Sequence, residues 1–400
     1  MTPSLIANPD VWMEGGALEQ LDRAAALAGC VRAVGLPDLH PGPGGMPIGV
    51  ALAFEDAILP SLLGSDVGCG VRVVLTRLRR PSLDRLERRL RSVLESPISL
   101  GEIPGVTEAL LAQGVHGLAG LESLPASLRQ LAAAEPPEDA LDPTLLAPDL
   151  LAPLHADALG TVGGGNHFAE LAFVSDVNRS DDAGAGLGDR LAVIVHSGSR
   201  GLGHQVGERF GGQRLASADA GAFLAAQRWA CRFAHANRFL LAWQLLSAAE
   251  AARPDKQALA VDCVHNQVVR RPLDGREVWL HRKGAAPAEG GQLTVVLGSR
   301  GAPTHLMRGT GQTSALESVA HGAGRRMTRS EALSKMRAKH PRDTLRRTRL
   351  GSRVLCDRTE TLYEEHPDVY KAIEPIIESI TTAGLATPVA TLTPLLTVKQ

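Results

Sequence analysis

The chain has 400 residues, with 42 Lys and Arg against 43 Asp and Glu, which gives a formal net charge of −1 at pH 7. This balance excludes a protein that binds polyanions through its overall charge, so any nucleic-acid surface must be a local patch. The 44% hydrophobic and 21% charged residues exclude intrinsic disorder, and no apolar run is long enough to span a membrane.

Hydrophobic periodicity predicts closely spaced strands in the N-terminal part. Apolar runs rich in β-branched residues predict strands at 31–37, 49–54 and 70–78, and the tight loops between them favour antiparallel pairing over crossover helices. An amphipathic pattern predicts a basic helix at 82–94. The Ala- and Pro-rich segment at about 130–159 is interpreted as an insertion or surface excursion, because its prolines forbid a long helix.

The rest of the chain alternates strands with one long helical region. Apolar spacing near 3.6 predicts long helical stretches within 220–251. Further strands are predicted at 166–174, 190–195, 259–264, 277–280 and 293–297. Together these elements predict a single α+β catalytic domain over residues 1–400, with mixed or antiparallel sheets and a metal-binding cleft at strand ends.

Cysteine usage and the N-terminus predict the cellular compartment. The five cysteines are odd in number and widely spaced, and no two form a CxxC pair, which argues against a disulfide framework or a zinc ribbon. The N-terminal residues show no basic stretch followed by an apolar core, so we do not expect export. We therefore predict a cytoplasmic protein with no membrane partner.

Glycine is over-represented, with 42 copies, and many lie beside metal-ligand residue types. Such glycines let the backbone approach an ion or phosphate closely. One such histidine is more often an ordinary core or surface residue, but its recurrence favours a shared site. Imidazole, thiolate and carboxylate together suit a divalent transition metal, and a thiolate can bridge two ions. Six clusters of this kind centre on His40, Asp66 with Cys69, His167, His196, His265 and His321.

A phosphate site is predicted from arginines, because the sequence contains neither a GxxxxGK[ST] P-loop nor a K-x-D/N-G pattern. Guanidinium groups bind phosphate oxygens in pairs, so Arg200, Arg325 and Arg329 are candidates. If a helix begins at Arg325, then Arg325 and Arg329 share one face next to His321. A neutral imidazole beside metal ions and such arginines is a candidate nucleophile at phosphorus, which indicates His321.

The stretch 325–353 carries eleven Lys and Arg residues against two acidic ones. It is interpreted either as a solvated helix and loop surface or as a patch that contacts RNA phosphates.

The chain resembles the RtcB family of RNA ligases from about residue 37 to residue 399. Nine motifs occur in the family's order: PDLHPG, GSDVGCG, GTVGGGNHFAE, HSGSRGLG, HN, HRKGA, GSRG, HGAGRRMTR and a C-terminal VK. In its short length the chain is most similar to the branch of this family that is encoded beside release factor H. The resemblance implies an enzyme of RNA repair or tRNA splicing that uses GTP and two Mn²⁺ ions. The resemblance further implies that this enzyme joins RNA 3′-phosphate or 2′,3′-cyclic phosphate ends to 5′-hydroxyl ends.

The resemblance also implies roles for individual residues. His321 matches the histidine that becomes linked to GMP, and Tyr370 matches a residue that stacks on guanine. The matching metal ligands are Asp66, Cys69, His167, His196 and His265. The matching nucleotide-binding positions are Asn166, Glu170, Asn266, Ser299, Thr304, Ala323, Gly324, Tyr370 and Lys399. The residues matching those that hold the RNA phosphate are Arg200, Arg325 and Arg329.

Four positions depart from the family pattern. Val264 replaces the first histidine of His-His-Asn, and Gln400 follows Lys399 in place of the commoner glycine. Arg300 and Thr304 stand where methionine and serine are common, so the nucleotide pocket is expected to be altered. One alternative is therefore a metal-dependent RNA-end phosphodiesterase or phosphatase without productive ligation, and another is a non-catalytic RNA-repair scaffold. The sequence leaves open the oligomeric state and any activating helper protein.

Overall fold

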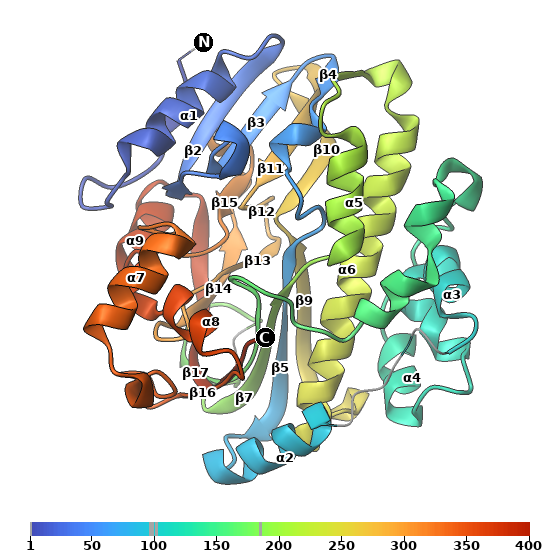
Figure 1. Cartoon of the computed structure of the whole chain (residues 1–400), viewed down its shortest axis with the longest axis vertical. Helices are drawn as coiled ribbons and strands as arrows, with labels where there is room; N and C mark the ends of the chain where they lie inside the picture. The colour runs from blue at the N-terminus through green and yellow to red at the C-terminus, as the bar shows by residue number, and fades with distance from the viewer. Residues whose placement is uncertain (1, 96–99, 101–102, 184–185) are drawn as a thin grey trace.

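The computed structural model describes residues 2–95, 100, 103–183 and 186–400, and an eight-stranded sheet forms its centre (Figure 1). Its strand order is β13 (Leu293–Val296), β14 (Thr304–Gly309), β17 (Ala386–Val398), β6 (Phe168–Val177), β7 (Arg190–Ser197), β5 (Gly70–Arg79) and β9 (Gln257–Val264), with β16 (Arg353–Leu355) paired to β17. These pairs are antiparallel except β16 with β17. The end strands β13 and β9 contact each other, so the sheet is nearly closed like a barrel.

A second, five-stranded sheet includes the N-terminal strands (Figure 1). Its order is β1 (Ser4–Leu5), β2 (Cys30–His40), β3 (Ile48–Phe54), β11 (Arg276–Lys283) and β10 (Asn266–Leu273). Only β1 and β2 are parallel among these pairs. Two short antiparallel pairs are β4 (Ala57–Ile58) with β8 (Leu215–Ala216) and β12 (Ala285–Pro287) with β15 (Ser318–Ala320).

Helices cover the sheets from several sides (Figure 1). They are α1 (Gly15–Ala25), α2 (Leu83–Glu95), α3 (Val106–Gln113), α4 (Ala126–Ala133), α5 (Gly201–Phe210), α6 (Gly221–Ala248), α7 (Arg329–Lys339), α8 (Thr359–Glu364) and α9 (Ile373–Thr382). None of the described helices is both long and apolar enough to cross a membrane.

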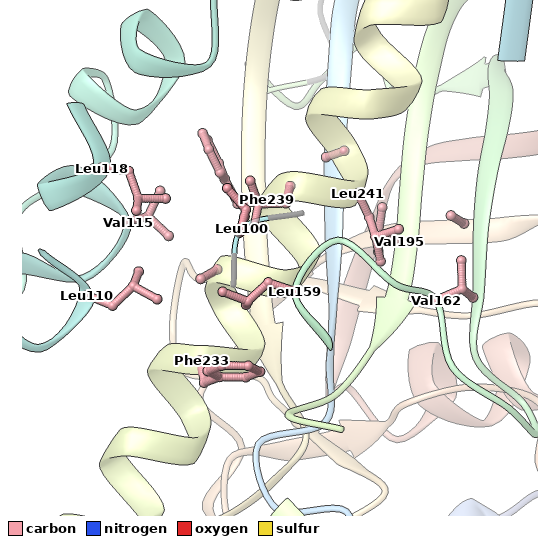
Figure 2. Packing of buried hydrophobic residues seen from close by; sticks show 14 of the residues in the cluster. Leu100, Leu110, Val115, Leu118, Leu159, Val162, Val195, Phe233, Phe239 and Leu241 are labelled. Carbon is pink, nitrogen blue, oxygen red and sulfur yellow. The ribbon is translucent and has the colours of Figure 1, made fainter. Parts of the chain in front are cut away.

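The 28-residue helix α6 is buried on almost every side, because alanine, leucine and aromatic residues occupy all its faces. It packs on β5, β6 and β7, and α2, α3 and α5 cover other parts of it. Figure 2 shows Phe239 and Leu241 of α6 between Val195 of the sheet and Leu110 and Val115 of the outer helical layer. One hydrophobic core therefore joins the helical layer to the sheet.

The structure confirms the predicted fold class and its main elements. The fold is α+β with mostly antiparallel sheets. The helices predicted at 82–94 and within 220–251 correspond to α2 and α6. The eight predicted strands correspond to β2, β3, β5, β6, β7, β9, β11 and β13.

The Ala- and Pro-rich segment 130–159 forms short 3₁₀ helices after the end of α4. Pro143 and Pro148 each occupy a first turn, where the missing N–H costs little. Leu150 and Leu159 are buried, and Trp229 of α6 donates a 2.9 Å hydrogen bond to the Leu150 carbonyl. The segment therefore packs on α6 through these residues, and it is exposed at Pro143–Leu145.

The conditional prediction of a helix from Arg325 is wrong. Helix α7 begins at Arg329, because Thr328 and Glu331 form a capping box there. Arg325 instead forms an isolated bridge with Tyr370. The two arginines therefore do not share a helical face.

Arg238 of α6 is the buried cation that ties the helix to the sheet, and its side chain is 0% exposed. Its Nε and Nη2 donate to the Asp262 carboxylate on β9 at 2.9 and 2.5 Å. Its Nη1 donates to the carbonyls of Gly68 and Ser197 at 3.1 and 3.0 Å. One guanidinium thus connects α6, β9, the end of β7 and the loop before β5.

We expect Arg238→Met to lower the free energy of unfolding by about 3–5 kcal/mol, because it leaves the Asp262 carboxylate without its partner. Adding Asp262→Leu should recover most of that loss, since the unpaired charge is then removed. Urea denaturation followed by circular dichroism measures both changes. The control is Arg308→Met, whose ion pair with Asp181 is 33% exposed on the arginine side and should cost about 1 kcal/mol or less. Equal losses in the two single variants would contradict the assignment.

Candidate functional site

Antiparallel pairing brings four of the predicted metal ligands to one edge of the eight-stranded sheet. In such pairs the start of one strand lies beside the end of its neighbour. Gly70, which opens β5, pairs with Ser197 at the end of β7 and with Val264 at the end of β9. Phe168, which opens β6, pairs with His196. The ligands gathered there are Cys69, His167, His196 and His265.

These side chains form a compact candidate metal centre. The Cys69 Sγ atom lies 3.3 Å from Nε2 of His167 and 3.4 Å from Nε2 of His196. Two three-residue groups with close donor atoms share the thiol, one with His196 and His265 and the other with Asp66 and His167. The overlap is the geometry expected when one thiolate serves two neighbouring cation positions.

The protonation states of these side chains suit a site that binds a metal cation. Burial and the Asp66 carboxylate raise the pKa of the Cys69 thiol well above its usual value. Burial lowers the pKa of His196 and His265 well below the ordinary value, so both imidazoles are neutral and able to bind a cation. Among the described residues, Nδ1 of His167 and Oδ1 of Asn266 are buried polar atoms without a hydrogen-bond partner. The donor set of thiol, imidazoles and carboxylate suits a first-row transition metal better than calcium or magnesium.

His321 follows β15 directly and lies beside this candidate metal centre. Its ring centroid lies 4.6 Å from that of His265 and 6.3 Å from that of His196. Nδ1 of His321 lies 2.7 Å from Oδ2 of Asp38, whose side chain is fully buried near the end of β2. When Nδ1–H donates a hydrogen bond to this carboxylate, the lone pair of the neutral imidazole is on Nε2, which can act as a nucleophile.

Gly324 permits this approach. Its φ of 72° is in the left-handed region, and a Cβ atom there would lie 2.3 Å from the Asp38 carbonyl oxygen. A larger residue would push the loop after His321 away from β2.

The candidate metal ligands and His321 line one cavity of about 770 Å³. Of the residues predicted from the sequence, those in its wall are Asp66, Cys69, Asn166, His167, His196, His265, Asn266, Ser299, His321, Ala323, Gly324, Arg325, Arg329, Tyr370 and Lys399.

Glu365 organises one end of the cavity. It accepts hydrogen bonds from the Tyr370 hydroxyl and, at 2.9 Å, from Nη1 of Arg325. The Lys399 ammonium lies 3.8 Å from it and donates to the His167 carbonyl at 3.1 Å. Burial lowers the pKa of Lys399 to about 8, although Glu365 opposes this shift. This end holds an aromatic ring and several donors together.

The structure places three predicted residues outside the cavity wall. Glu170 lies behind it and accepts a hydrogen bond from the Thr397 hydroxyl, and burial raises the pKa of Glu170 to about 8. The Thr304 hydroxyl accepts a 3.4 Å hydrogen bond from the Gly298 N–H. Arg200 is half-buried, and its Nε donates to the Thr161 hydroxyl at 3.2 Å.

Arg300 also lies in the wall. Its Nη2 donates to the Leu362 carbonyl at 2.9 Å, whereas Nε and Nη1 are buried without a partner among the described residues. Burial lowers the pKa of Arg300 to about 10.

Sequence reasoning assigned no role to Asp38, Glu365 or Arg238. Asp38 lies within PDLHPG, so its place two residues before His40 was a usable signal. Glu365 and Arg238 stand in stretches whose pattern does not distinguish them from ordinary helix or loop residues.

Comparison with known proteins identifies relatives that span the chain. The family model described as "tRNA-splicing ligase RtcB" matches residues 20–216 and 213–400. RNA-splicing ligase RtcB2 of Escherichia coli ATCC 25922 is 35% identical over 99% of this chain and 95% of its own length. RNA-splicing ligase RtcB of Mycobacterium tuberculosis is 32% identical over 95% of this chain and 100% of its own length. RNA-splicing ligase RtcB of Escherichia coli K12 is 28% identical over 91% of this chain and 90% of its own length.

Both the near-complete family match and a relative above 30% identity agree with the motifs that line the cavity. The chain therefore belongs to the RtcB family of RNA-splicing ligases.

Proposed function

We propose that this chain is a GTP- and Mn²⁺-dependent ligase that joins RNA 3′-phosphate or 2′,3′-cyclic phosphate ends to 5′-hydroxyl ends. The observation that carries the proposal is the position of His321, held by Asp38 and beside the cluster of metal ligands in one cavity. The family membership supports an RNA ligase. The whole chain acts as one catalytic domain in this proposal, because residues from Asp38 to Lys399 meet at the site.

The reaction follows from the chemistry of the RNA end. A phosphate monoester is a poor electrophile, so the 3′-phosphate needs activation, and a cyclic end is first hydrolysed to that phosphate. Nε2 of His321 attacks the α-phosphate of GTP, and pyrophosphate leaves. The GMP then passes to the RNA 3′-phosphate, and the 5′-hydroxyl attacks that phosphate, losing its proton while GMP departs.

The residues around His321 have separate roles in this proposal. Asp38 holds the imidazole in the reactive tautomer and stabilises the positive charge that develops on it. Asp66, Cys69, His167, His196 and His265 would hold two Mn²⁺ ions. Bound ions of this kind neutralise charge on phosphoryl oxygens.

The groups in and beside the cavity wall suit the two substrates. Tyr370, Lys399 and the groups around Glu365 would bind guanine, whereas Arg329 in the wall and Arg200 just outside it would contact the RNA phosphate. Exposed arginines that follow α7 would contact the RNA backbone independently of sequence. They are Arg342, Arg346, Arg347 and Arg349.

A second candidate function is a metal-dependent RNA-end phosphodiesterase or phosphatase. Arg300 favours it, because a buried guanidinium with two unpaired nitrogens in the wall alters the nucleotide end of the cavity. The products separate the two candidates. A hydrolase opens cyclic ends without GTP and never yields longer RNA, whereas the proposed ligase lengthens RNA only with GTP.

Incubation with α-labelled GTP and Mn²⁺ should leave covalent label on the wild-type protein and none on His321→Asn, because the asparagine has no imidazole nitrogen to attack phosphorus. Gel electrophoresis under denaturing conditions measures the label. The matched control is His204→Asn, which changes an exposed histidine on α5 that faces Glu208 and should label as the wild type does. Equal labelling of His321→Asn would contradict the nucleophile assignment.

We expect Asp38→Asn to slow the labelling of His321 by about 10²-fold or more, because the amide no longer stabilises the imidazolium and can donate to Nδ1, which favours the wrong tautomer. The rate constant for label incorporation should fall while the GTP concentration for half-maximal rate stays unchanged. A fall confined to GTP affinity would instead place Asp38 in nucleotide binding.

Metal affinity should decrease as pH falls. The raised pKa of Cys69 means that the metal-free protein carries a thiol, so ligation must release its proton. Each released proton weakens binding about tenfold per unit decrease in pH. Competition titration of Mn²⁺ between pH 6 and 8 measures this slope, and Cys69→Ser should bind more weakly with a shallower slope. A pH-independent affinity for the wild type would rule out thiolate ligation.

A further inference from the structure

A second cluster of metal-ligand residue types lies at the C-terminal end of α7, outside the cavity. His340 follows the last residue of α7, and His366 and Asp368 lie in the turn between α8 and Tyr370. The donor atoms of these three residues all lie within 4.8 Å of one another. None of the three is in the wall of the central cavity, so this cluster is separate from the site described above.

The arrangement resembles an open three-ligand site. Oδ2 of Asp368 lies 3.1 Å from Nε2 of His340, and Oδ1 lies 3.9 Å from Nδ1 of His366. The carboxylate therefore faces both imidazoles. Two donors on one tetrahedral ion lie about 3.3 Å apart, so small side-chain rotations would close the site.

The packing of the two imidazoles also supports a metal site. The rings of His340 and His366 stack with centroids 3.9 Å apart and planes 23° from parallel. Nδ1 of His366 accepts a 3.2 Å hydrogen bond from the Asp368 N–H, which fixes this ring beside the carboxylate, and an ion bound at Nδ1 would replace that hydrogen bond. The side chains of His340, His366 and Asp368 are only 19%, 15% and 25% exposed, which limits their motion and keeps an open face toward solvent.

We infer that His340, His366 and Asp368 form a second, peripheral site for a divalent first-row transition ion such as Zn²⁺, with water completing its coordination. Two imidazoles and one carboxylate are a common donor set for such ions. The Lys339 ammonium competes with the ion for the Asp368 carboxylate. Its nitrogen lies 2.6 Å from Oδ2 of Asp368 and must move away when the ion binds.

The ion would connect two elements that flank the cavity. His340 ends the helix that begins with Arg329, and Asp368 stands two residues before Tyr370. Arg329 and Tyr370 both line the cavity. The inference does not depend on the proposed ligase chemistry, because it rests on residues outside the central site.

Equilibrium dialysis of the metal-free full chain against Zn²⁺ tests the site. The wild type should bind one ion per chain more than His340→Gln or Asp368→Asn. His204→Gln is the matched control, because His204 is exposed and has only Glu208 as a neighbouring carboxylate at 3.4 Å. It should bind as many ions as the wild type. Equal Zn²⁺ content in the wild type, His340→Gln and Asp368→Asn would overturn the inference.

Two further measurements separate this site from the central one. Co²⁺ at the central site gives sulfur-to-metal charge-transfer absorption through Cys69, whereas a site without sulfur gives only the weaker visible bands. In His340→Gln the charge-transfer band should remain, which also shows that the variant is folded, while part of the visible absorption is lost. Lys339→Met should bind the peripheral ion several-fold more tightly, because it removes the competing ammonium. Unchanged affinity in Lys339→Met would show that the ion does not sit on Asp368.

Discussion

The geometry of the candidate metal centre depends on the buried ion pair between Arg238 and Asp262. Arginine suits this position because its planar guanidinium stays charged and offers five donors in fixed directions. Two of them satisfy the carboxylate, and Nη1 binds the carbonyls of Gly68 and Ser197. Those carbonyls belong to the residues next to Cys69 and His196, so the helix that fills the core also sets the spacing of the metal ligands. Stability and site geometry therefore share one interaction.

The centre combines a rigid half and an approaching half. The rigid half is an edge of paired strands, where the His265 N–H also donates to the Cys69 carbonyl at 2.9 Å. The approaching half carries His321 directly after β15 and Asp38 on β2, and these two strands belong to other sheets. Val264 ends β9 in one sheet and Asn266 begins β10 in another, with His265 between them, so the chain itself passes through the boundary between the halves. A nucleophile held by one layer can thus face ligands held by another.

Much of the fold and site followed from local pattern, and the rest required long-range contacts. Strands with continuous apolar runs, such as β5 and β7, were predictable because burial on both faces leaves a clear signal. Strand β17 was not, because Pro388 and Pro394 disfavour a central strand, and the pairing accommodates each proline beside a register shift. The candidate metal ligands stood out in the sequence because glycines surround them. Arg238 and Glu365 were not, since a charged residue reveals its burial only through partners distant in sequence.

The charges around the cavity explain how a chain of nearly zero net charge can bind polyanions. Burial lowers the pKa of Lys283 and Lys399 in the cavity wall to about 8, so each ammonium is only marginally stable without an anionic ligand. Glu365 supplies one carboxylate for several cations, which leaves the remaining positive charge unbalanced. Under the proposed function, the triphosphate and the RNA end would balance that charge and raise these pKa values. Substrate binding would then take up protons near pH 8, whereas metal binding at Cys69 releases one, so the two steps respond to pH in opposite directions.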